Sequence, residues 1–383
     1  MGFTYKSDLT QSSDASPDKS LVQNSNGSVP RDTNAGETVS NKKKWIKRCV
    51  AVLKLVVLAL IFLWIGRQLQ KSWADIAQYE WRPRYSWIVL SGIFYIVAFL
   101  PSATLWYLSL RWFGQEPGYW DSIKAFYLSQ LGKYVPGKAM VVIIRADSIA
   151  GPKVRASIAA VSVFYETLTM MGSGAFIAAL IVLCLFRQHW FFSCMALGVA
   201  VASCVPLLPP VFVRILKLLR IGANDPQVQE SLRSLKYSCL IKGFALTSVL
   251  WLFFGLSLWA AICGIGIVPQ PLLTALPRYV SVVALAMALG FAVPISPGGL
   301  GIREAVLSAL LIPYFVVILQ YPENESFSIA PEALATIVSL LQRIVSILAE
   351  VAAVALLFAA VPAIKKAWNL LSKKTEKSEV ESF

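Results

Sequence analysis

Long apolar runs dominate the chain from about residue 46 onward. Three examples are Leu55–Ile65, Ile88–Leu100 and Ile344–Val361, the last interrupted by Ser346 and Glu350. A soluble helix shows apolar residues only every three or four positions, whereas these runs are nearly continuous. About 20 mainly apolar residues cross the hydrocarbon core of a bilayer. The pattern therefore predicts an all-α integral membrane protein with about eight transmembrane helices.

The predicted helices leave two polar tails outside the membrane domain. Residues 1–43 are rich in Ser, Asn, Asp and Gly, so we expect a disordered tail that buries too little apolar surface to fold. Residues 44–366 form the polytopic domain, and residues 367–383 form a basic and polar tail. The predicted spans are Ile46–Gly66, Tyr85–Phe113, Ser157–Phe186, Trp190–Ile215, Ser238–Ile267, Tyr279–Val293, Leu300–Gln320 and Leu334–Val361.

Charge distribution orients these spans. Hydrophobic residues make up 57% of the chain and charged residues 15%, whereas soluble domains carry about 25% charged residues. The net charge of +14 is spread over clusters at residues 42–48, 214–242 and 365–377, each beside a predicted span. Positive loops face the cytoplasm, so we expect both termini and the Arg214–Lys242 loop there and the acidic Tyr321–Glu332 loop outside. This predicts a multi-pass protein of the cell (inner or plasma) membrane and no nucleic-acid partner.

Motifs for metal, cofactor or enzyme chemistry are missing from the sequence. The six cysteines are scattered without a C-x-x-C pair, and His189 is the single histidine. There is no P-loop, G-x-S-x-G or H-E-x-x-H motif. We therefore assign no metal ligand, no cofactor and no catalytic residue.

One stretch, Tyr119–Ala150, is too polar and too broken for a span. It contains QLGKYVPGK (Gln130–Lys138), followed by an apolar piece that reaches Arg145. Neither half can cross about 30 Å of hydrocarbon, and Pro136-Gly137 breaks the helix between them. We predict a re-entrant helical hairpin that enters from the cytoplasmic side.

A second break, PISPGGLGIREA (Pro294–Ala305), interrupts the last third of the chain. Each break is followed by a helix that carries an arginine, Arg145 or Arg303. Paired broken helices in the two halves of a transporter mark an inverted repeat with the substrate between them. A broken helix presents unpaired N–H groups and the positive end of its dipole, which attract an anion.

We therefore expect a lipid headgroup phosphate to bind between the two breaks. The basic candidates would contact the phosphate, and the proline and glycine candidates would shape the broken helices. The predicted binding residues are Lys133, Tyr134, Pro136, Gly137, Lys138, Arg145, Pro297, Gly298, Gly299, Gly301, Arg303 and Glu304.

Structural roles compete with this interpretation. Pro-Gly breaks can simply turn the chain, and lysines beside them can extend to the membrane interface. Arg303 and Glu304 could form a local ion pair. Glu166 and Arg343 lie inside predicted spans, where charge is costly and often functional; they could pair with each other or with the motif residues. For Glu350 a structural pairing is favoured.

The two breaks resemble a known family. Gln130–Lys138 and Pro297–Ala305 are similar, in order and spacing, to the two signature stretches of the lysylphosphatidylglycerol synthase transmembrane-region family, also called flippase-like. The resemblance covers about Lys44–Lys366, and Arg343 in the last span matches a family arginine. It implies a membrane region that binds or flips anionic lipid.

Two departures from the family pattern bear on the expected function. Members often have Glu-Arg in the span after the first motif, but Glu166 is followed here by Thr167. Bifunctional members add a soluble aminoacyl-tRNA-dependent transferase, and we expect that domain to be absent here because the chain continues only a few residues past Lys377.

The sequence thus predicts a protein that binds, and translocates, an anionic phospholipid or a polyprenyl-phosphate-linked lipid. One alternative is a membrane-embedded headgroup transferase, which would need an acid or base such as Glu166 or Glu304 facing a polar cavity. Another is a non-transporting partner of a lipid-modifying enzyme. The expected partners are the bilayer, an anionic lipid, and either a second copy of the chain or such an enzyme.

The charge clusters generate a topology prediction. Single cysteines placed at Lys44, Asn224 and Lys373 should react with an impermeant thiol reagent only from the cytoplasmic side, and one at Asn324 only from outside. Labelling of intact cells and of inverted vesicles measures this. A cytoplasmic Asn324 would contradict the eight-span arrangement.

Overall fold

The computed structural model describes residues 83–134, 139–185, 190–219, 225–292, 299, 301–324 and 329–380, with Leu63, Arg67 and Gln70. The chain divides into two units, Met1–Val52 and Leu53–Phe383. Every described residue belongs to the second unit. The predicted N-terminal tail, and the predicted span Ile46–Gly66 except for Leu63, lie outside the described residues.

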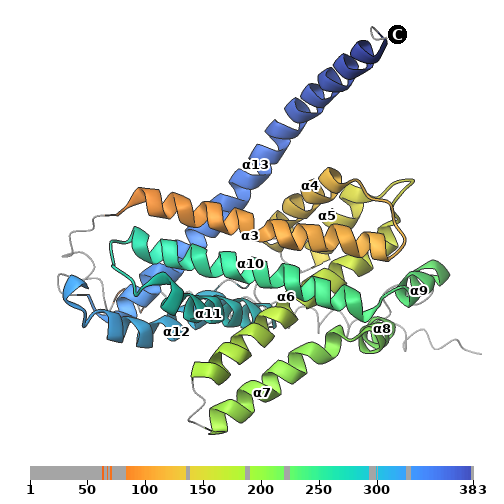
Figure 1. Ribbon diagram of the computed structural model, residues 1–383. Coiled ribbons are helices and arrows are strands. Elements are labelled where there is room, and N and C mark those ends of the chain that lie inside the picture. Colours follow the sequence, from red (N-terminus) through yellow and green to blue (C-terminus); the bar gives the residue numbers. More distant parts are fainter. Residues whose placement is uncertain are drawn as a thin grey trace, which may run out of the picture. The chain divides into compact units, whose positions relative to one another are not determined.

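The described residues form helices, and no β-strand occurs among them (Figure 1). An all-α fold is therefore confirmed. The elements are α3 (Tyr85–Trp112), α4 (Tyr119–Gln130), η1 (Leu131–Tyr134), α5 (Ala139–Ile149), α6 (Ala156–Leu185), α7 (Trp190–Cys204), η2 (Val205–Leu207), α8 (Pro209–Leu218), α9 (Pro226–Arg233), α10 (Tyr237–Gly264), α11 (Leu272–Ala292), α12 (Ile302–Ile318), η4 (Pro322–Asn324) and α13 (Pro331–Val380).

Five described helices are long and apolar enough to cross a membrane: α3, α6, α10, α11 and α13. A sixth span results if α7 with η2 and α8 are counted as one bent unit. The predicted count of eight is not confirmed, because α12 has 17 residues and the first predicted span is not described. The conclusion that the chain is a multi-pass, all-α membrane protein holds.

Two predicted spans differ from the observed helices. The predicted Trp190–Ile215 span is not one straight helix, since the chain bends by 71° between Leu207 and Pro209. Pro206, Pro209 and Pro210 lack the N–H groups that would continue the hydrogen-bond ladder. Helix α11 begins at Leu272, before the predicted start at Tyr279, and it includes Pro277 near its N-terminus.

Helices α3 and α10 form the centre of the bundle. Ser91 and Ser257 exchange hydrogen bonds across them: the Ser91 hydroxyl donates to the Ser257 carbonyl (2.7 Å), and the Ser257 hydroxyl donates to the Ser91 carbonyl (2.9 Å). Small polar residues at such a contact let two membrane helices approach closely. Tyr95, Phe99 and Phe254 pack beside this pair, with ring centroids 5.1–5.3 Å apart.

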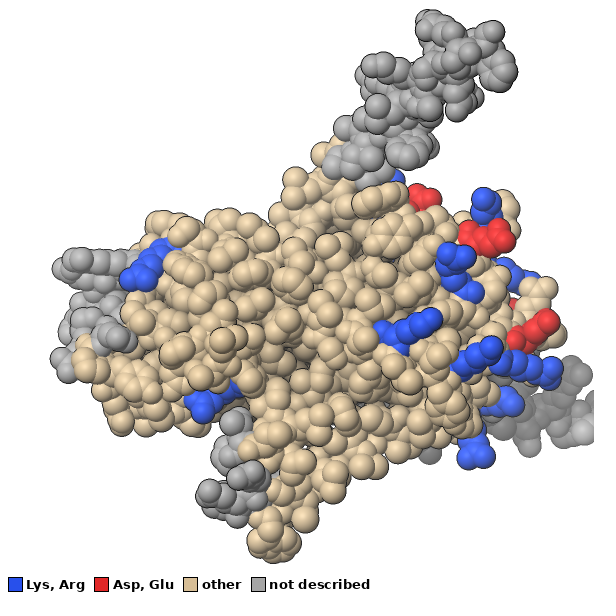
Figure 2. Space-filling model, viewed as in Figure 1, with Lys and Arg blue, Asp and Glu red and all other residues tan. Residues whose placement is uncertain are grey.

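The bundle has two ends that differ in charge. At one end the Ser234 hydroxyl bonds to the Trp112 carbonyl, so the loop around α9 lies beside the end of α3. We call this the basic end; Arg111, Lys153, Arg155, Arg233 and Lys236 lie there. In Figure 2 most of the visible Lys and Arg side chains gather where Figure 1 shows α8 and α9.

The start of α3 and the end of α10 define the opposite end, where the Arg84 N–H donates to the Gly264 carbonyl (2.8 Å). Asn324 of the acidic loop binds Val268 there. The Arg214–Lys242 and Tyr321–Glu332 loops therefore lie at opposite ends, as their charges predict. Which end faces the cytoplasm remains a prediction.

Asn324 itself proves unsuitable for a label. It is fully buried, and its amide bonds to Val268 and to the Ile318 carbonyl (3.0 Å). Gln320, which is exposed at the same end, is the better position for the outside label.

Helix α9 is fixed to the basic end by its N-cap. The Asp225 carboxylate accepts hydrogen bonds from the Ser157 hydroxyl (3.0 Å) and the Gln227 N–H (3.1 Å), and Arg155 lies 3.9 Å away. These contacts, led by the bond from Ser157, lower the pKa of Asp225. The charged cap thus joins α9 to the start of α6.

Helices α4 and α5 form the predicted hairpin. The segments that flank it meet at the basic end: the Glu116 N–H donates to the Lys153 carbonyl (3.2 Å), and the Arg155 N–H donates to the Gln115 side chain (2.9 Å). The chain therefore enters and leaves at the same end. At 12 and 11 residues, the helices are about 18 and 16 Å long, too short to span.

Helices α11 and α12 form a second hairpin that enters from the opposite end. They pack side by side (Figure 1), and α12 ends at Ile318, whose carbonyl bonds to Asn324. The end of α11 and the start of α12 lie together, with Gly290 beside Arg303, and Arg303 is buried close to Tyr95 of α3 and Glu350 of α13. Two broken hairpins that enter from opposite ends are the arrangement an inverted repeat requires.

The first hairpin generates a labelling prediction. Gly118→Cys and Gly151→Cys, in a background without the six native cysteines, should both react from the same side of the membrane. Both positions are exposed, no atom lies within 4 Å of a Cβ at Gly151, and only the Asp121 side chain does at Gly118. Reaction from opposite sides would show that α4 and α5 together cross the membrane.

Candidate functional site

The tips of the two hairpins meet beside α13 in a buried cluster of charged residues. The first tip contributes Lys133 and Tyr134 from η1. Lys133 forms an ion pair with Glu350 of α13, and the Tyr134 hydroxyl donates to the same carboxylate (2.9 Å). The guanidinium of Arg343, also on α13, lies 5.4 Å from the centre of the Tyr134 ring.

Glu350 is the centre of this cluster. Its Oε1 accepts hydrogen bonds from the Tyr95 hydroxyl of α3 (2.8 Å) and from Lys133, while its Oε2 accepts from Tyr134. The Glu350 side chain is 2% exposed and that of Lys133 is 19% exposed. Lys133 is therefore the most exposed cation of the cluster, and Tyr134 beside it is also only partly buried. Sequence reasoning favoured a structural pairing for Glu350 and left it out of the predicted site.

The second tip contributes the first turn of α12. The Glu304 carboxylate accepts a hydrogen bond from the Gly301 N–H, and its Oε1 lies 3.5 Å from Arg343 Nε. Arg303 is buried and lies close to Tyr95 and to the carboxylates of Glu304 and Glu350. Glu304 therefore pairs with Arg343 of α13, and not locally with Arg303 as the alternative interpretation of the sequence has it.

This cluster holds more positive than negative charge. Lys133, Arg303 and Arg343 carry three positive charges, and Glu304 and Glu350 carry two negative ones. Ionisable side chains inside a membrane protein are costly and mark binding or transport pathways. Over the described residues, the cluster therefore carries one more positive than negative formal charge. No group of three or more His, Cys, Asp or Glu in that part of the chain could hold a metal ion.

Glycines shape both tips. A Cβ at Gly132 would come within 3.0 Å of the Val141 backbone nitrogen, so only glycine lets η1 pack this closely on α5. Gly301, immediately before α12, has φ of 83°, a left-handed conformation that favours glycine. Gly299 also has a left-handed backbone, with φ of 72°. The other tip residues of the prediction, Pro136, Gly137, Lys138, Pro297 and Gly298, lie outside the described residues.

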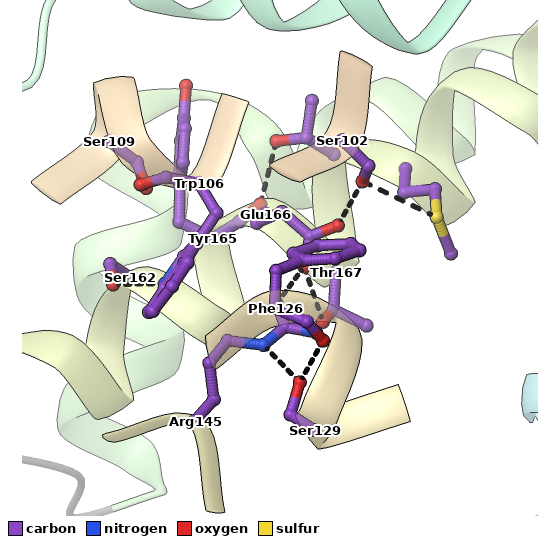
Figure 3. A network of polar contacts seen from close by, with 12 residues as sticks. Ser102, Trp106, Ser109, Phe126, Ser129, Arg145, Ser162, Tyr165, Glu166 and Thr167 are labelled. Carbon is purple, nitrogen blue, oxygen red and sulfur yellow. Dashed lines mark hydrogen bonds and ion pairs between the residues drawn. The ribbon is translucent and has the colours of Figure 1, made fainter. Parts of the chain in front are cut away.

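Arg145 belongs to a separate network (Figure 3). Its guanidinium pairs with Glu166 of α6 (2.8 Å) and donates to the Ser129 hydroxyl (2.8 Å). The Ser102 hydroxyl of α3 donates to the other oxygen of Glu166. Arg145 and Glu166 are each 2% exposed. The sequence allows Glu166 to pair either with Arg343 or with a motif residue. The structure shows the pair with Arg145, the arginine that follows the first break.

An aromatic layer separates the two networks. The Arg145 guanidinium lies 4.2 Å from the centre of the Phe126 ring, and Phe126 packs on Phe99 with centroids 6.0 Å apart. On the other side, the Lys133 ammonium lies 5.8 Å from the Phe99 ring. The predicted basic residues are therefore divided between two buried sites.

Comparison with known families adds to this geometry. A family model described as the lysylphosphatidylglycerol synthase TM region matches residues 51–330, most of the chain. The chain belongs to this family. A search among curated proteins gives no match. The match ends before Arg343 and Glu350, so it is narrower than the expected Lys44–Lys366, and the α13 half of the cluster lies beyond it.

The Arg145 network generates a stability prediction. Glu166→Gln should lower the free energy of unfolding by about 3–5 kcal/mol, because it leaves a buried guanidinium without its counter-ion. Arg145→Met should cost a similar amount, and the double variant should cost less than the sum. Denaturant titration in detergent measures this, with Glu332→Gln at the exposed start of α13 as the control. If the stability losses of the two single variants simply add up in the double variant, Arg145 and Glu166 do not stabilise each other as an ion pair.

Proposed function

We propose that this membrane protein binds the headgroup phosphate of an anionic lipid at the Lys133–Glu350 cluster and moves the lipid between leaflets. The observation that carries the proposal is the position of Lys133. Its side chain is partly exposed at the tip of one hairpin, and its ammonium lies next to the buried charges of Arg303 and Arg343.

The cluster offers the chemistry that a phosphate needs. Lys133 supplies a compact ammonium, and the two arginines supply planar forks that bind phosphate oxygens through paired hydrogen bonds. Tyr134 adds a hydroxyl donor beside them. Three cations against two carboxylates favour a ligand with negative charge.

The opposed hairpins support transport. One tip reaches the cluster from the basic end and the other from the opposite end, so a movement of either hairpin would open the site toward a different leaflet. The family takes its name from a lysylphosphatidylglycerol synthase, which supports a lipid-related function. An anionic phospholipid and a polyprenyl phosphate share the phosphate that the cluster would bind.

The transferase alternative has less support. Its two candidate acids are already held: Glu166 pairs with Arg145, and Glu304 pairs with Arg343 and the Gly301 N–H. Neither carboxylate is more than 5% exposed. A flipping assay separates the remaining alternatives. Purified protein in phosphatidylcholine liposomes should move fluorescent phosphatidylglycerol or a labelled polyprenyl phosphate between leaflets, whereas a non-transporting partner would move neither.

Arg303 provides the sharpest prediction of this function. Arg303→Lys keeps the charge but loses the fork geometry, so it should fold normally and bind lipid more weakly. Loss of one charged hydrogen-bond partner costs about 1.5–3 kcal/mol, roughly a tenfold to hundredfold weaker Kd. Native mass spectrometry of bound phosphatidylglycerol and the flipping rate both measure this.

The control is Arg278→Lys, an arginine of α11 that packs on the Tyr314 ring away from the cluster. It should change neither lipid binding nor flipping. Melting temperatures of all variants separate folding from binding. If Arg303 is only a structural brace, Arg303→Lys will be silent and Arg303→Ala will melt earlier. Full lipid binding by a folded Arg303→Ala protein would exclude the headgroup role.

A further inference from the structure

We propose that Glu350 is a resident anion that the lipid phosphate displaces, and that Glu350 takes up one proton when this happens. Lipid binding would then be coupled to proton binding. This inference rests on the proposed function, because it concerns how the same cluster changes when the phosphate arrives.

The geometry of Glu350 suggests the displacement. Its two oxygens accept hydrogen bonds from the Lys133 ammonium and from the Tyr95 and Tyr134 hydroxyls. These are the donors that an incoming phosphate would need at the accessible side of the cluster. As long as Glu350 holds them, the most exposed cation of the site is occupied by the protein's own carboxylate.

Few groups around Glu350 could balance its negative charge once a phosphate has taken Lys133 and the two tyrosine hydroxyls. Among the described residues, the titratable and charged groups that face it are Tyr95 from α3, Lys133 and Tyr134 from η1, Arg303 from α12 and Arg343 from its own helix. Arg343 also serves Glu304. Helix α10 contacts α13 through the neutral Ser257. The Ser257 hydroxyl accepts a hydrogen bond from the Gln342 side chain of α13.

Displacement without a proton would leave the Glu350 carboxylate beside the phosphate without the Lys133 ammonium and the two tyrosine hydroxyls. The remaining cations nearby are Arg303 and the Arg343 that also serves Glu304. Like charges that share a buried site do not both stay ionised, and a carboxylate at 2% exposure has no water to replace its lost partners. A proton from solvent removes the conflict: it converts the Glu350 carboxylate into a neutral acid. The acid gains an O–H donor that can bond to the phosphate.

Proton uptake can be measured directly on the wild-type protein. Titration calorimetry with dihexanoyl-phosphatidylglycerol, in buffers of different ionisation enthalpy at one pH, gives the number of protons bound per lipid. We expect about one proton per lipid, and a Kd that rises up to about tenfold per pH unit in the range where uptake is complete. The sign follows because a reaction that binds a proton is favoured at low pH.

Two variants locate the proton. Glu350→Gln has no carboxylate to protonate, so lipid binding by this variant should take up or release almost no protons. Its Kd for the lipid should not vary with pH. Glu332→Gln makes the same substitution at the exposed start of the same helix and should behave as the wild type. Melting temperatures confirm that both variants are folded.

The outcomes distinguish this inference from the proposed function. Wild-type protein that binds the lipid without net proton uptake overturns the inference and leaves the proposed function standing; this result needs no variant. Equal uptake by wild type and folded Glu350→Gln also overturns it, because the proton then binds elsewhere. Wild-type protein that does not bind phosphatidylglycerol or a short-chain polyprenyl phosphate overturns both.

Discussion

A carboxylate in the interior of a membrane protein is stable only where cations and hydroxyls replace its hydration, and Glu350 draws these partners from three elements. Tyr95 comes from the central helix α3, Lys133 and Tyr134 come from the tip of the first hairpin, and Arg303 of the second hairpin lies close by. No single element could satisfy this group. The requirement to pair Glu350 therefore brings both broken tips to one place on α13.

The second buried ion pair has a different consequence. Arg145 and Glu166 join the hairpin helix α5 to the span α6, and the Ser102 hydroxyl extends the network to α3. With Phe99 and Phe126 between the two networks, the helices of the first hairpin are held by contacts separate from those of Lys133 and Tyr134. Under the proposed function, these two residues would exchange partners around Glu350 while the Arg145 network stays in place.

Local sequence patterns predicted the elements but not the pairs. The apolar runs located α3, α6, α10 and the start of α13 to within about three residues, and the Pro-Gly break located the first hairpin, because length and helix breaking are local properties. Helix α13 continues to Val380, well past the predicted end at Val361, and the second break was predicted to separate two spans. Lys133 and Glu350 are 217 positions apart, and nothing local in either segment specifies its partner. The one available signal was that Glu350 is the only acidic residue in the Ile344–Val361 run.

The difference between continuous and broken helices gives a physical reason for the two helix breaks, each of which costs backbone hydrogen bonds. Continuous helices such as α3 and α10 satisfy most of their backbone groups internally, and the reciprocal Ser91–Ser257 bonds join them. A broken tip leaves N–H groups and charges that need partners, and those partners can be supplied either by the protein or by a ligand. In the structure Glu350 and Glu304 supply them. The phosphate of the lipid proposed as ligand is likewise an anion with oxygen acceptors, so it would compete with these carboxylates for the same donors.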